Sequence, residues 1–583
     1  MSLHALDWAL VVAYFVLTVV VGLAFSRRAS SSMVEFFVSG RSLPWWLAGT
    51  SMVATTFAAD TPLAVTGLVV NNGIAGNWLW WNFLMSGMLT VFLYARLWRR
   101  SGVLTDVEFT EIRYGGKPAA VLRAFRALYL AIPINAIIMG WVTLAMVKIL
   151  GIVLGVGRIE AIVLSLAVVL LYSTLSGLWG VVVTDFVQFA IAMTGSIALA
   201  VFTLSAVGGV SGLEEKLAAM YPATSESLFR FVPEVGSAWM PISAFLVYVF
   251  VQWWAAWYPG AEPGGGGYIA QRIFSAKDEK HSLLATLWFN VAHYALRPWP
   301  WILVALASMV LYPDLADKEA GYVRTMVDHM PTGFLGLMVA AFFAAFMSTI
   351  STQLNWGSSY LINDFYRRFL VRERDEGHYV RASRIATVIT MLLAGLATLL
   401  METISGAWRF LLALGAGSGS VYILRWYLWR INAWSEIAAM AASLVTALTL
   451  QLAFGLSAEK PKDFAALMLI TVAVTTIVWL AVTFLTRPED DKVLQEFYRR
   501  VRPGGPGWRP IRARLGLDEG ESLWPDFRDW AAGCVLVYAS LFAIGKLLLG
   551  RELEAAVYAV VAAAAGWVVY RDLSRRGWAS IAD

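Results

Sequence analysis

Hydroxyl residues crowd into one apolar stretch of this chain, and their chemistry suits a bound cation. The stretch AAFFAAFMSTISTQLNWGSSYLINDFY covers 340–366 and places Ser348, Thr349, Ser351 and Thr352 within five positions. Hard cations prefer oxygen ligands, and hydroxyls with freed carbonyls supply them without buried negative charge. Too few carboxylates lie nearby in the sequence to balance a divalent ion, so the pattern favours sodium. The alternative is helix packing, since Ser and Thr also line helix–helix contacts.

Two carboxylates occupy long apolar stretches, where acids are rare and usually functional. Asp185 lies in VVVTDFVQF, near the start of its stretch, so capping of that helix is the alternative. Asp60 lies in SMVATTFAADTPLAVTG, just before Pro62. Proline removes a backbone donor and clashes with the preceding turn, so a helix should break or kink there.

A second set of polar and aromatic residues predicts a pocket for an organic solute. Aromatic faces and carboxylates suit an amine, whereas an arginine or a helix N-terminus suits a carboxylate. Most of the tryptophans also fit an interfacial belt, His293 fits ordinary packing, and Glu262 could instead pair with Arg297 as a gate. The predicted substrate-binding residues are Asp60, Trp81, Asn82, Trp257, Tyr258, Glu262, His293 and Arg297.

The elements that position these residues must be membrane-spanning helices. Of the 583 residues, 59% are hydrophobic and 15% charged, which is too apolar for a soluble chain of this size. Apolar stretches of about twenty residues predict about fifteen helical spans. The net charge of +5 is no sign of nucleic acid binding, because the basic residues gather in particular loops. The single cysteine, Cys534, excludes a disulfide framework.

The arginine-rich loops predict the orientation. Arg27, Arg99, Arg272, Arg368 and Arg499 belong to clusters that fall on one side of the predicted spans, and the loops 71–76 and 209–238 are poor in basic residues. The positive-inside rule then places the N-terminus outside and the C-terminus in the cytoplasm of a cell membrane. An odd number of spans agrees with this.

Two spans carry interruptions at matching places. The second breaks near Asp60–Pro62 and the seventh at Pro259–Gly267, within WYPGAEPGGGGYIAQR. Five spans separate them, so the two helices cross in opposite senses. Breaks survive in lipid only where they line a cavity or bind something. Matching broken helices therefore predict an inverted-repeat transporter with its site near the midplane.

Several motifs, in this order and spacing, resemble the sodium:solute symporter family, whose members carry sugars, proline, pantothenate or sialic acid. The match covers about residues 1–485. Its motifs are FFVSGRSLPWW (36–46), TDVEFTEIRYG (105–115), YSTLSGLWGVVVTDFVQ (172–188), QRIFSAKD (271–278) and the STIST helix.

The resemblance implies an all-α membrane protein with a LeuT-like core of five plus five inverted helices. An extra N-terminal helix precedes this core and about four helices follow it. The implied segments are 1–43 (extra helix and linker), 44–208 (first repeat), 209–430 (second repeat), 431–486 (two further helices), 487–527 (cytoplasmic linker) and 528–583 (two C-terminal helices).

The family's principal sodium site corresponds to Ala54, Phe57, Ala345, Ser348 and Thr349. A further site found in some members corresponds to Asp185, Ser348, Ser351 and Thr352. We therefore expect a sodium-coupled symporter that moves two ions per cycle, with sodium as coupling ion and no organic cofactor. Its partners are a small solute and membrane lipid, not nucleic acid.

The solute is expected to be amino-acid-like, zwitterionic or an amine rather than a simple hexose. Sugar-transporting relatives place acids and hydroxyls where this chain has Trp81 and Asn82. Coupling to protons is the nearest alternative, since Asp60, Asp185 and Glu262 could titrate. A membrane enzyme or a transporter-like sensor is a more distant one, because no nucleophile motif, metal-ligand spacing or signalling domain is found.

Overall fold

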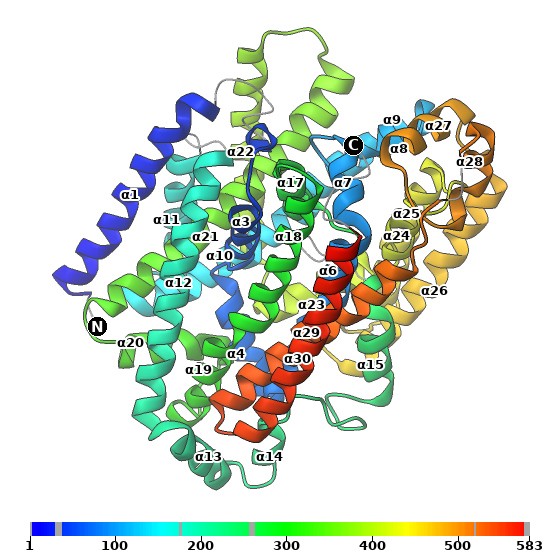
Figure 1. The fold of residues 1–583 in the computed structure, drawn as a ribbon. Helices are drawn as coiled ribbons and strands as arrows, with labels where there is room; N and C mark the ends of the chain where they lie inside the picture. The colour runs from blue at the N-terminus through cyan, green and yellow to red at the C-terminus, as the bar shows by residue number, and fades with distance from the viewer. Residues whose placement is uncertain (1–2, 30–37, 174–177, 256–262, 518–519, 577–583) are drawn as a thin grey trace.

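The computed structural model describes residues 3–29, 38–173, 178–255, 263–517 and 520–576. Within these residues the chain is helical, with one isolated β-bridge between Leu43 and Ala276, so the all-α prediction is confirmed. Nine of the described helices are long and apolar enough to cross a membrane, and a bent pair makes ten. Shorter apolar helices complete a tall bundle (Figure 1).

The segment predicted as the first repeat begins with a broken helix. Helix α3 (Trp45–Thr56) and helix α4 (Asp60–Asn72) meet at an angle of 60°. The helices that follow are α5 (Trp78–Trp81), α6 (Leu84–Leu89), a π-helical turn (Thr90–Tyr94), α7 (Ala95–Ser101), α8 (Phe109–Arg113), α9 (Gly116–Tyr129), a π-helical turn (Leu130–Ile134), α10 (Asn135–Leu154), α11 (Arg158–Ser173) and α12 (Leu178–Val207).

In the segment predicted as the second repeat, a helix ends at Ala255, and residues 256–262 lie outside the described part. Residues 263–266 are not helical, and α17 (Gly267–Ser275) follows them. Its helices are α13 (Gly209–Met220), α14 (Ser225–Leu228), α15 (Ile242–Val247), a π-helical turn (Tyr248–Gln252), α16 (Trp253–Ala255), α17, α18 (Glu279–Asn290), a π-helical turn (Val291–Leu296), α19 (Pro298–Leu311), α20 (Gly321–His329), α21 (Phe334–Ser359) with its π-helical extension (Tyr360–Leu370), α22 (Glu376–Leu399), α23 (Ile404–Gly415) and α24 (Gly419–Leu424).

The carboxylate of Asp7 joins the N-terminal helix α1 (Ala5–Ala29) to the start of α21 through hydrogen bonds. Asp7 is fully buried, and its Oδ1 accepts hydrogen bonds from the Gly333 and Gly336 amides at 2.7 and 2.8 Å. The first amides of a helix lack partners within the helix and carry partial positive charge, so an acid there is stabilising. Gly336 allows the close approach, because a Cβ would lie 2.3 Å from the Asp7 Cα.

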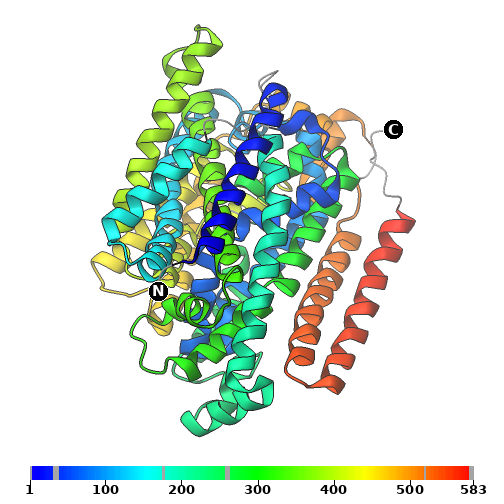
Figure 2. The same ribbon diagram turned by 90° about the vertical axis from the view of Figure 1, so that its left-hand side faces the viewer.

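Helices α25 (Ala433–Leu452) and α26 (Pro461–Leu485) follow the core, and the segment predicted as a linker comes next. It contains α27 (Asp491–Val501) and α28 (Arg509–Leu515) and buries Phe497 and Trp508 completely, so it is folded and packed rather than extended. Helices α29 (Trp524–Leu548) and α30 (Glu552–Arg575) form a C-terminal hairpin at the edge of the bundle (Figure 2).

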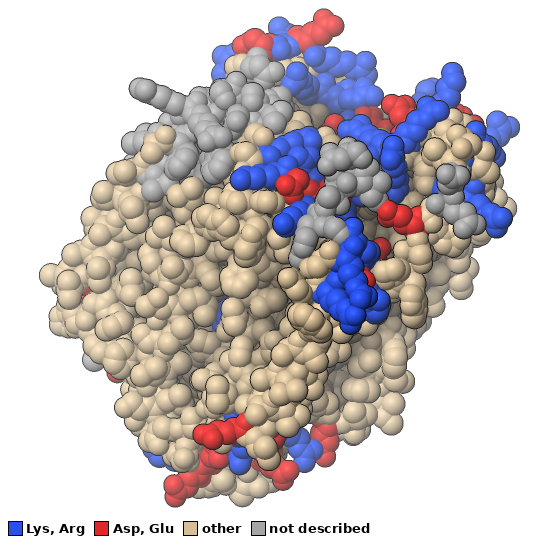
Figure 3. All heavy atoms as spheres, viewed as in Figure 1, with Lys and Arg blue, Asp and Glu red and all other residues tan. Residues whose placement is uncertain are grey.

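Charge is distributed unevenly over the molecule. In the view of Figure 3, lysines and arginines gather at the upper end, near α7, α17 and α27, and a broad uncharged band covers the middle. Acidic residues with a few basic ones lie at the lower end, near α13 and the turn between α29 and α30. A band of this kind is what lipid-facing surface requires.

Candidate ion and solute sites

The break between α3 and α4 leaves three buried residues outside any helix. It falls at Phe57–Ala59, slightly earlier than the predicted Asp60–Pro62. Pro62 lies instead in the first turn of α4, where a helix tolerates proline because its missing N–H would have no partner there. Two features therefore bound the break. Phe57, with ψ of 70°, ends α3, and Pro62 lies in the first turn of α4.

The residues of the predicted principal sodium site lie at the end of α3, beside this break, and on α21. Ala54, Phe57, Ala345, Ser348 and Thr349 are all buried. The Thr349 hydroxyl donates to the Thr55 carbonyl at 3.1 Å, which joins α21 directly to the end of α3. Hydroxyl and carbonyl oxygens are thus concentrated where the resemblance implied a cation.

The residues of the predicted second sodium site lie one turn further along α21 and on α12. Asp185 is fully buried and accepts hydrogen bonds from Ser348 through Oδ1 and from Ser51, at 2.6 Å, through Oδ2. The Ser351 hydroxyl donates to the Ser348 carbonyl at 3.2 Å, and Thr352 Oγ1 makes no hydrogen bond within the described residues. Since α12 begins at Leu178, Asp185 does not cap its helix.

Arg272 is a member of this cluster that the sequence did not reveal. It lies on α17, is fully buried, and places Nη2 3.8 Å from Asp185 Oδ2. Its guanidinium donates to Ser51 and Thr55 hydroxyls, each at 3.3 Å, and to Gln271 Oε1 at 2.8 Å. The motif QRIFSAKD contained this arginine, but nothing local indicated a partner 87 positions earlier in the chain.

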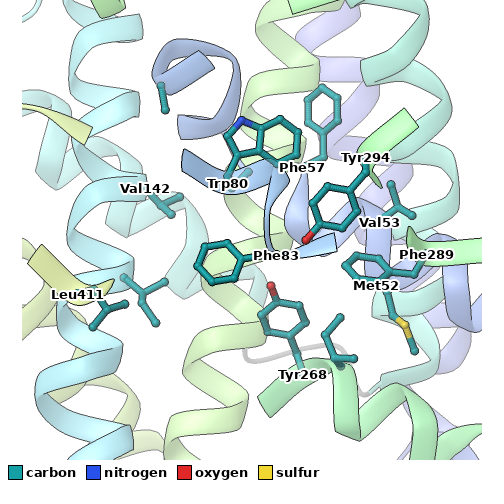
Figure 4. Packing of buried hydrophobic residues seen from close by; sticks show 14 of the residues in the cluster. Met52, Val53, Phe57, Trp80, Phe83, Val142, Tyr268, Phe289, Tyr294 and Leu411 are labelled. Atoms are coloured by element: carbon teal, nitrogen blue, oxygen red, sulfur yellow. The ribbon is translucent and has the colours of Figure 1, made fainter. Parts of the chain in front are cut away.

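A cavity of about 60 Å³ adjoins the end of α3 and is lined by two of the predicted pocket residues, His293 and Arg297. Its lining residues are Thr56, Thr61, Leu79, Trp80, Phe83, His293, Tyr294, Arg297, Trp408 and Leu412. A smaller cavity shares Thr56 and Thr61 with it and adds Asp60, Tyr268 and Gln353. Figure 4 shows the Tyr268 and Tyr294 hydroxyls pointing toward the same space beside Phe83.

Polar contacts hold the base of the larger cavity. Arg297 is 1% exposed and donates to the Val53 carbonyl at 3.2 Å and to Thr56 Oγ1 at 3.1 Å. His293 Nδ1 lies 3.0 Å from the same hydroxyl. Trp80 stacks on Tyr294 with ring centroids 5.6 Å apart, so one wall is aromatic.

The predicted pocket residues have different fates. Asp60, His293 and Arg297 line the two adjoining cavities. Trp81 is fully buried, and Asn82 donates to the carbonyls of Trp78 and Leu79. Neither lines the two cavities described above, whereas Trp80 and Phe83 line the larger one. Trp257, Tyr258 and Glu262 lie outside the described residues. The cavities also contain residues that were not predicted. Nothing in the sequence around Trp408 indicates a pocket, whereas Thr56 and Tyr268 lie next to the predicted helix breaks and could have been predicted from them.

Comparison with known proteins supplies the identity of the chain. The sodium:solute symporter family model matches residues 36–446. The chain belongs to the sodium:solute symporter family. Similar proteins include sodium/glucose cotransporter 1 of Mus musculus, 25% identical with 89% of this chain and 83% of that protein covered. The sodium/glucose cotransporter of Vibrio parahaemolyticus is 24% identical, with 84% and 92% covered.

A solved structure of a Na+-coupled sialic acid symporter has the same fold. It aligns with a TM-score of 0.66 at 20% identity and covers 84% of this chain and 99% of that one. The LeuT-like prediction is confirmed at the level of fold, and this symporter-family member is a multi-pass membrane transporter, not an enzyme. Sodium is its coupling ion.

Proposed function

We propose that this symporter moves an amine or amino-acid-like solute together with two sodium ions. The observation that supports the solute class is Asp60, which is 2% exposed and whose Oδ1 makes no hydrogen bond within the described residues. A buried carboxylate oxygen without a partner costs free energy, and a solute ammonium would remove that cost. Arg297 lines the larger cavity, which shares Thr56 and Thr61 with the cavity that contains Asp60. A solute carboxylate would bind to this arginine.

The two sodium ions would occupy the two oxygen clusters on α21. The first would use Ala54, Phe57, Ala345, Ser348 and Thr349, and the second Asp185, Ser348, Ser351 and Thr352. One monovalent cation crossing 100 mV down a tenfold gradient supplies about 3.7 kcal/mol, which concentrates a neutral solute roughly 500-fold. Two ions raise this limit to about 10⁵.

A reversal-potential measurement on reconstituted protein tests the stoichiometry. With a zwitterionic solute we expect two charges per solute, and with Asp185→Ala a single charge. One charge per solute in the unaltered protein contradicts the two-ion proposal, and so does unchanged sodium dependence in Asp185→Ala. Uptake that persists without sodium and follows pH would favour proton coupling instead.

A thermal-shift screen in sodium and in potassium tests the solute class. Its panel contains amino acids, amines, organic acids and hexoses, because the relatives named above include glucose cotransporters. We expect sodium-dependent stabilisation by an amine or amino acid, and loss of that stabilisation in Asp60→Asn. Stabilisation by a neutral hexose that survives Asp60→Asn would contradict the solute class.

A further inference from the structure

Asp185 already has a positive partner in the cluster that is proposed to bind the second sodium ion. Arg272 and Asp185 are both fully buried, and their charges balance across 3.8 Å. Burial of either charge alone would be costly, so each holds the other in the interior. The separation is longer than a hydrogen bond, and the guanidinium donates instead to Ser51, Thr55 and Gln271.

A sodium ion bound by Asp185, Ser351 and Thr352 would place a second positive charge on the same carboxylate. Two cations beside one buried anion repel each other strongly in a medium of low dielectric. Three hydrogen bonds to neutral oxygens anchor Arg272 at other points, so a small withdrawal from Asp185 would not leave it without partners.

We propose that Arg272 and the second sodium ion compete for Asp185, so that sodium binding exchanges one cation for another. The ion then replaces Arg272 as the cation nearest the Asp185 carboxylate, while Arg272 keeps its hydrogen bonds to Ser51, Thr55 and Gln271. This inference rests on the proposed second sodium site and names the residue that sets its affinity. No proton or covalent bond changes hands in the exchange.

Arg272 is connected through its neighbours to the principal sodium site and to the proposed solute pocket. Thr55 accepts from Arg272 through its hydroxyl and from Thr349 through its carbonyl, so it touches both ion clusters. Arg272 also lies one helical turn from Tyr268, which lines the cavity that contains Asp60. Release of Arg272 from Asp185 would therefore loosen α17 beside the solute pocket.

Equilibrium binding of radioactive sodium to purified protein, without solute, tests the exchange through Arg272→Gln. We expect the half-saturating sodium concentration of the second site to fall at least about tenfold, because a competing unit charge is removed. Arg425→Gln is the matched control: Arg425 is 1% exposed and pairs with Glu436 at 3.3 Å, away from both clusters. Its sodium affinity should equal that of the unaltered protein.

A sodium affinity in Arg272→Gln that is unchanged or weaker overturns the exchange. If Arg272→Gln does not fold, hydrogen exchange in the unaltered protein decides: sodium, compared with potassium, should increase exchange over Gly267–Ser275, and equal exchange overturns the proposal. Failure of the proposed function looks different, since the unaltered protein would then bind fewer than two sodium ions.

Discussion

Neighbouring hydroxyls on α21 have different partners although they differ little in chemistry. Ser348 donates to Asp185 on α12, and Thr349 donates to the Thr55 carbonyl on α3. Residues 348 and 349 point about 100° apart on a helix, so adjacent positions reach different elements. One turn of helix thus contacts both proposed ion sites.

Replacing Thr349 by Val should weaken sodium binding while the fold survives. The substitution conserves shape and removes one hydroxyl, so we expect the half-saturating sodium concentration for transport to rise about 10- to 100-fold. Thr203→Val is the control, since Thr203 is also buried and, within the described residues, donates to the Leu199 carbonyl of its own helix. Equal sodium dependence in Thr349→Val and Thr203→Val would show that Thr349 is no ligand.

Glu319 accepts hydrogen bonds from four donor groups, at the end of the molecule opposite the arginine-rich end. It is 4% exposed, lies 2.7 Å from Lys148 Nζ, and accepts from the Ile404 and Ser405 amides and the Ser405 hydroxyl. Glu319→Gln removes the charge, and we expect the free energy of unfolding to fall by about 1.5–3 kcal/mol. Thermal unfolding in detergent measures it.

The exposed pair Arg230–Glu226 provides the comparison for Glu319. Glu226→Gln should leave the unfolding temperature unchanged, because an exposed ion pair contributes little. A drop in Glu226→Gln as large as in Glu319→Gln would mean that lost charge alone, and not burial, explains the effect.

Individual residues also show where sequence reasoning stops. The hydroxyl cluster and Asp185 were visible because polar groups stand out in apolar stretches. Trp80 and Trp81 were indistinguishable, since the helix is interrupted at Asn82 and Phe83 and this irregularity decides which indole faces the cavity. Arg272 and Asp185 meet because α17 and α12 both pack on α3, which no local pattern reports.

At the scale of elements, the C-terminal hairpin is attached to the core through tryptophan and tyrosine side chains. Trp530 donates to the Met85 carbonyl and Tyr538 to the Trp81 carbonyl, both at 2.8 Å. From the other side, Trp299 on α19 donates to the Leu541 carbonyl at 3.0 Å. Helix α29 therefore bonds to α5 and α6 of the first predicted repeat and to α19 of the second.

Gly545 allows α29 to approach Trp299, and this predicts the effect of one methyl group. A Cβ at Gly545 would lie 1.9 Å from the Trp299 ring, so Gly545→Ala should destabilise the protein by about 1–3 kcal/mol. Gly566→Ala on α30 is the matched control, because its Cβ would lie 3.5 Å from Leu536, an ordinary contact. Unfolding temperatures of the two variants that agree would contradict this account of the docking.

The sequence predicts helical elements well where apolar stretches are long and poorly where helices are short. The broken second span was expected from Asp60 and Pro62, and its break was displaced because proline fits the first turn of α4. Helices α27 and α28 were not expected in a polar, glycine-rich segment, because their stability comes from burying residues such as Phe497 and Trp508 against the core.

At the scale of the whole molecule, the arrangement of charge predicts the direction of insertion. The arginine-rich end and the end near α13 and α14 lie on opposite sides of the uncharged band (Figure 3). We expect the arginine-rich end to face the cytoplasm. The odd number of predicted spans agrees with this orientation, because it places the two termini on opposite sides of the membrane.

Labelling of single cysteines with a membrane-impermeant maleimide tests this orientation in a Cys534→Ala background. Ala223, in the loop before α14, and Glu373, in the loop before α22, are both exposed. In intact cells we expect Ala223→Cys to react and Glu373→Cys to react only after permeabilisation. The reverse pattern would invert the topology.

The attachment of α29 also has a mechanical consequence. Because Met85, Trp81 and Trp299 all bond to this one helix, any tilting of the core helices that contain them must carry the hairpin along. Helix α30 lies outermost and presents most of its surface outward, so that movement sweeps through acyl chains. The viscosity of the surrounding bilayer would then act as a drag on the transport cycle, separate from any effect on ion or solute affinity.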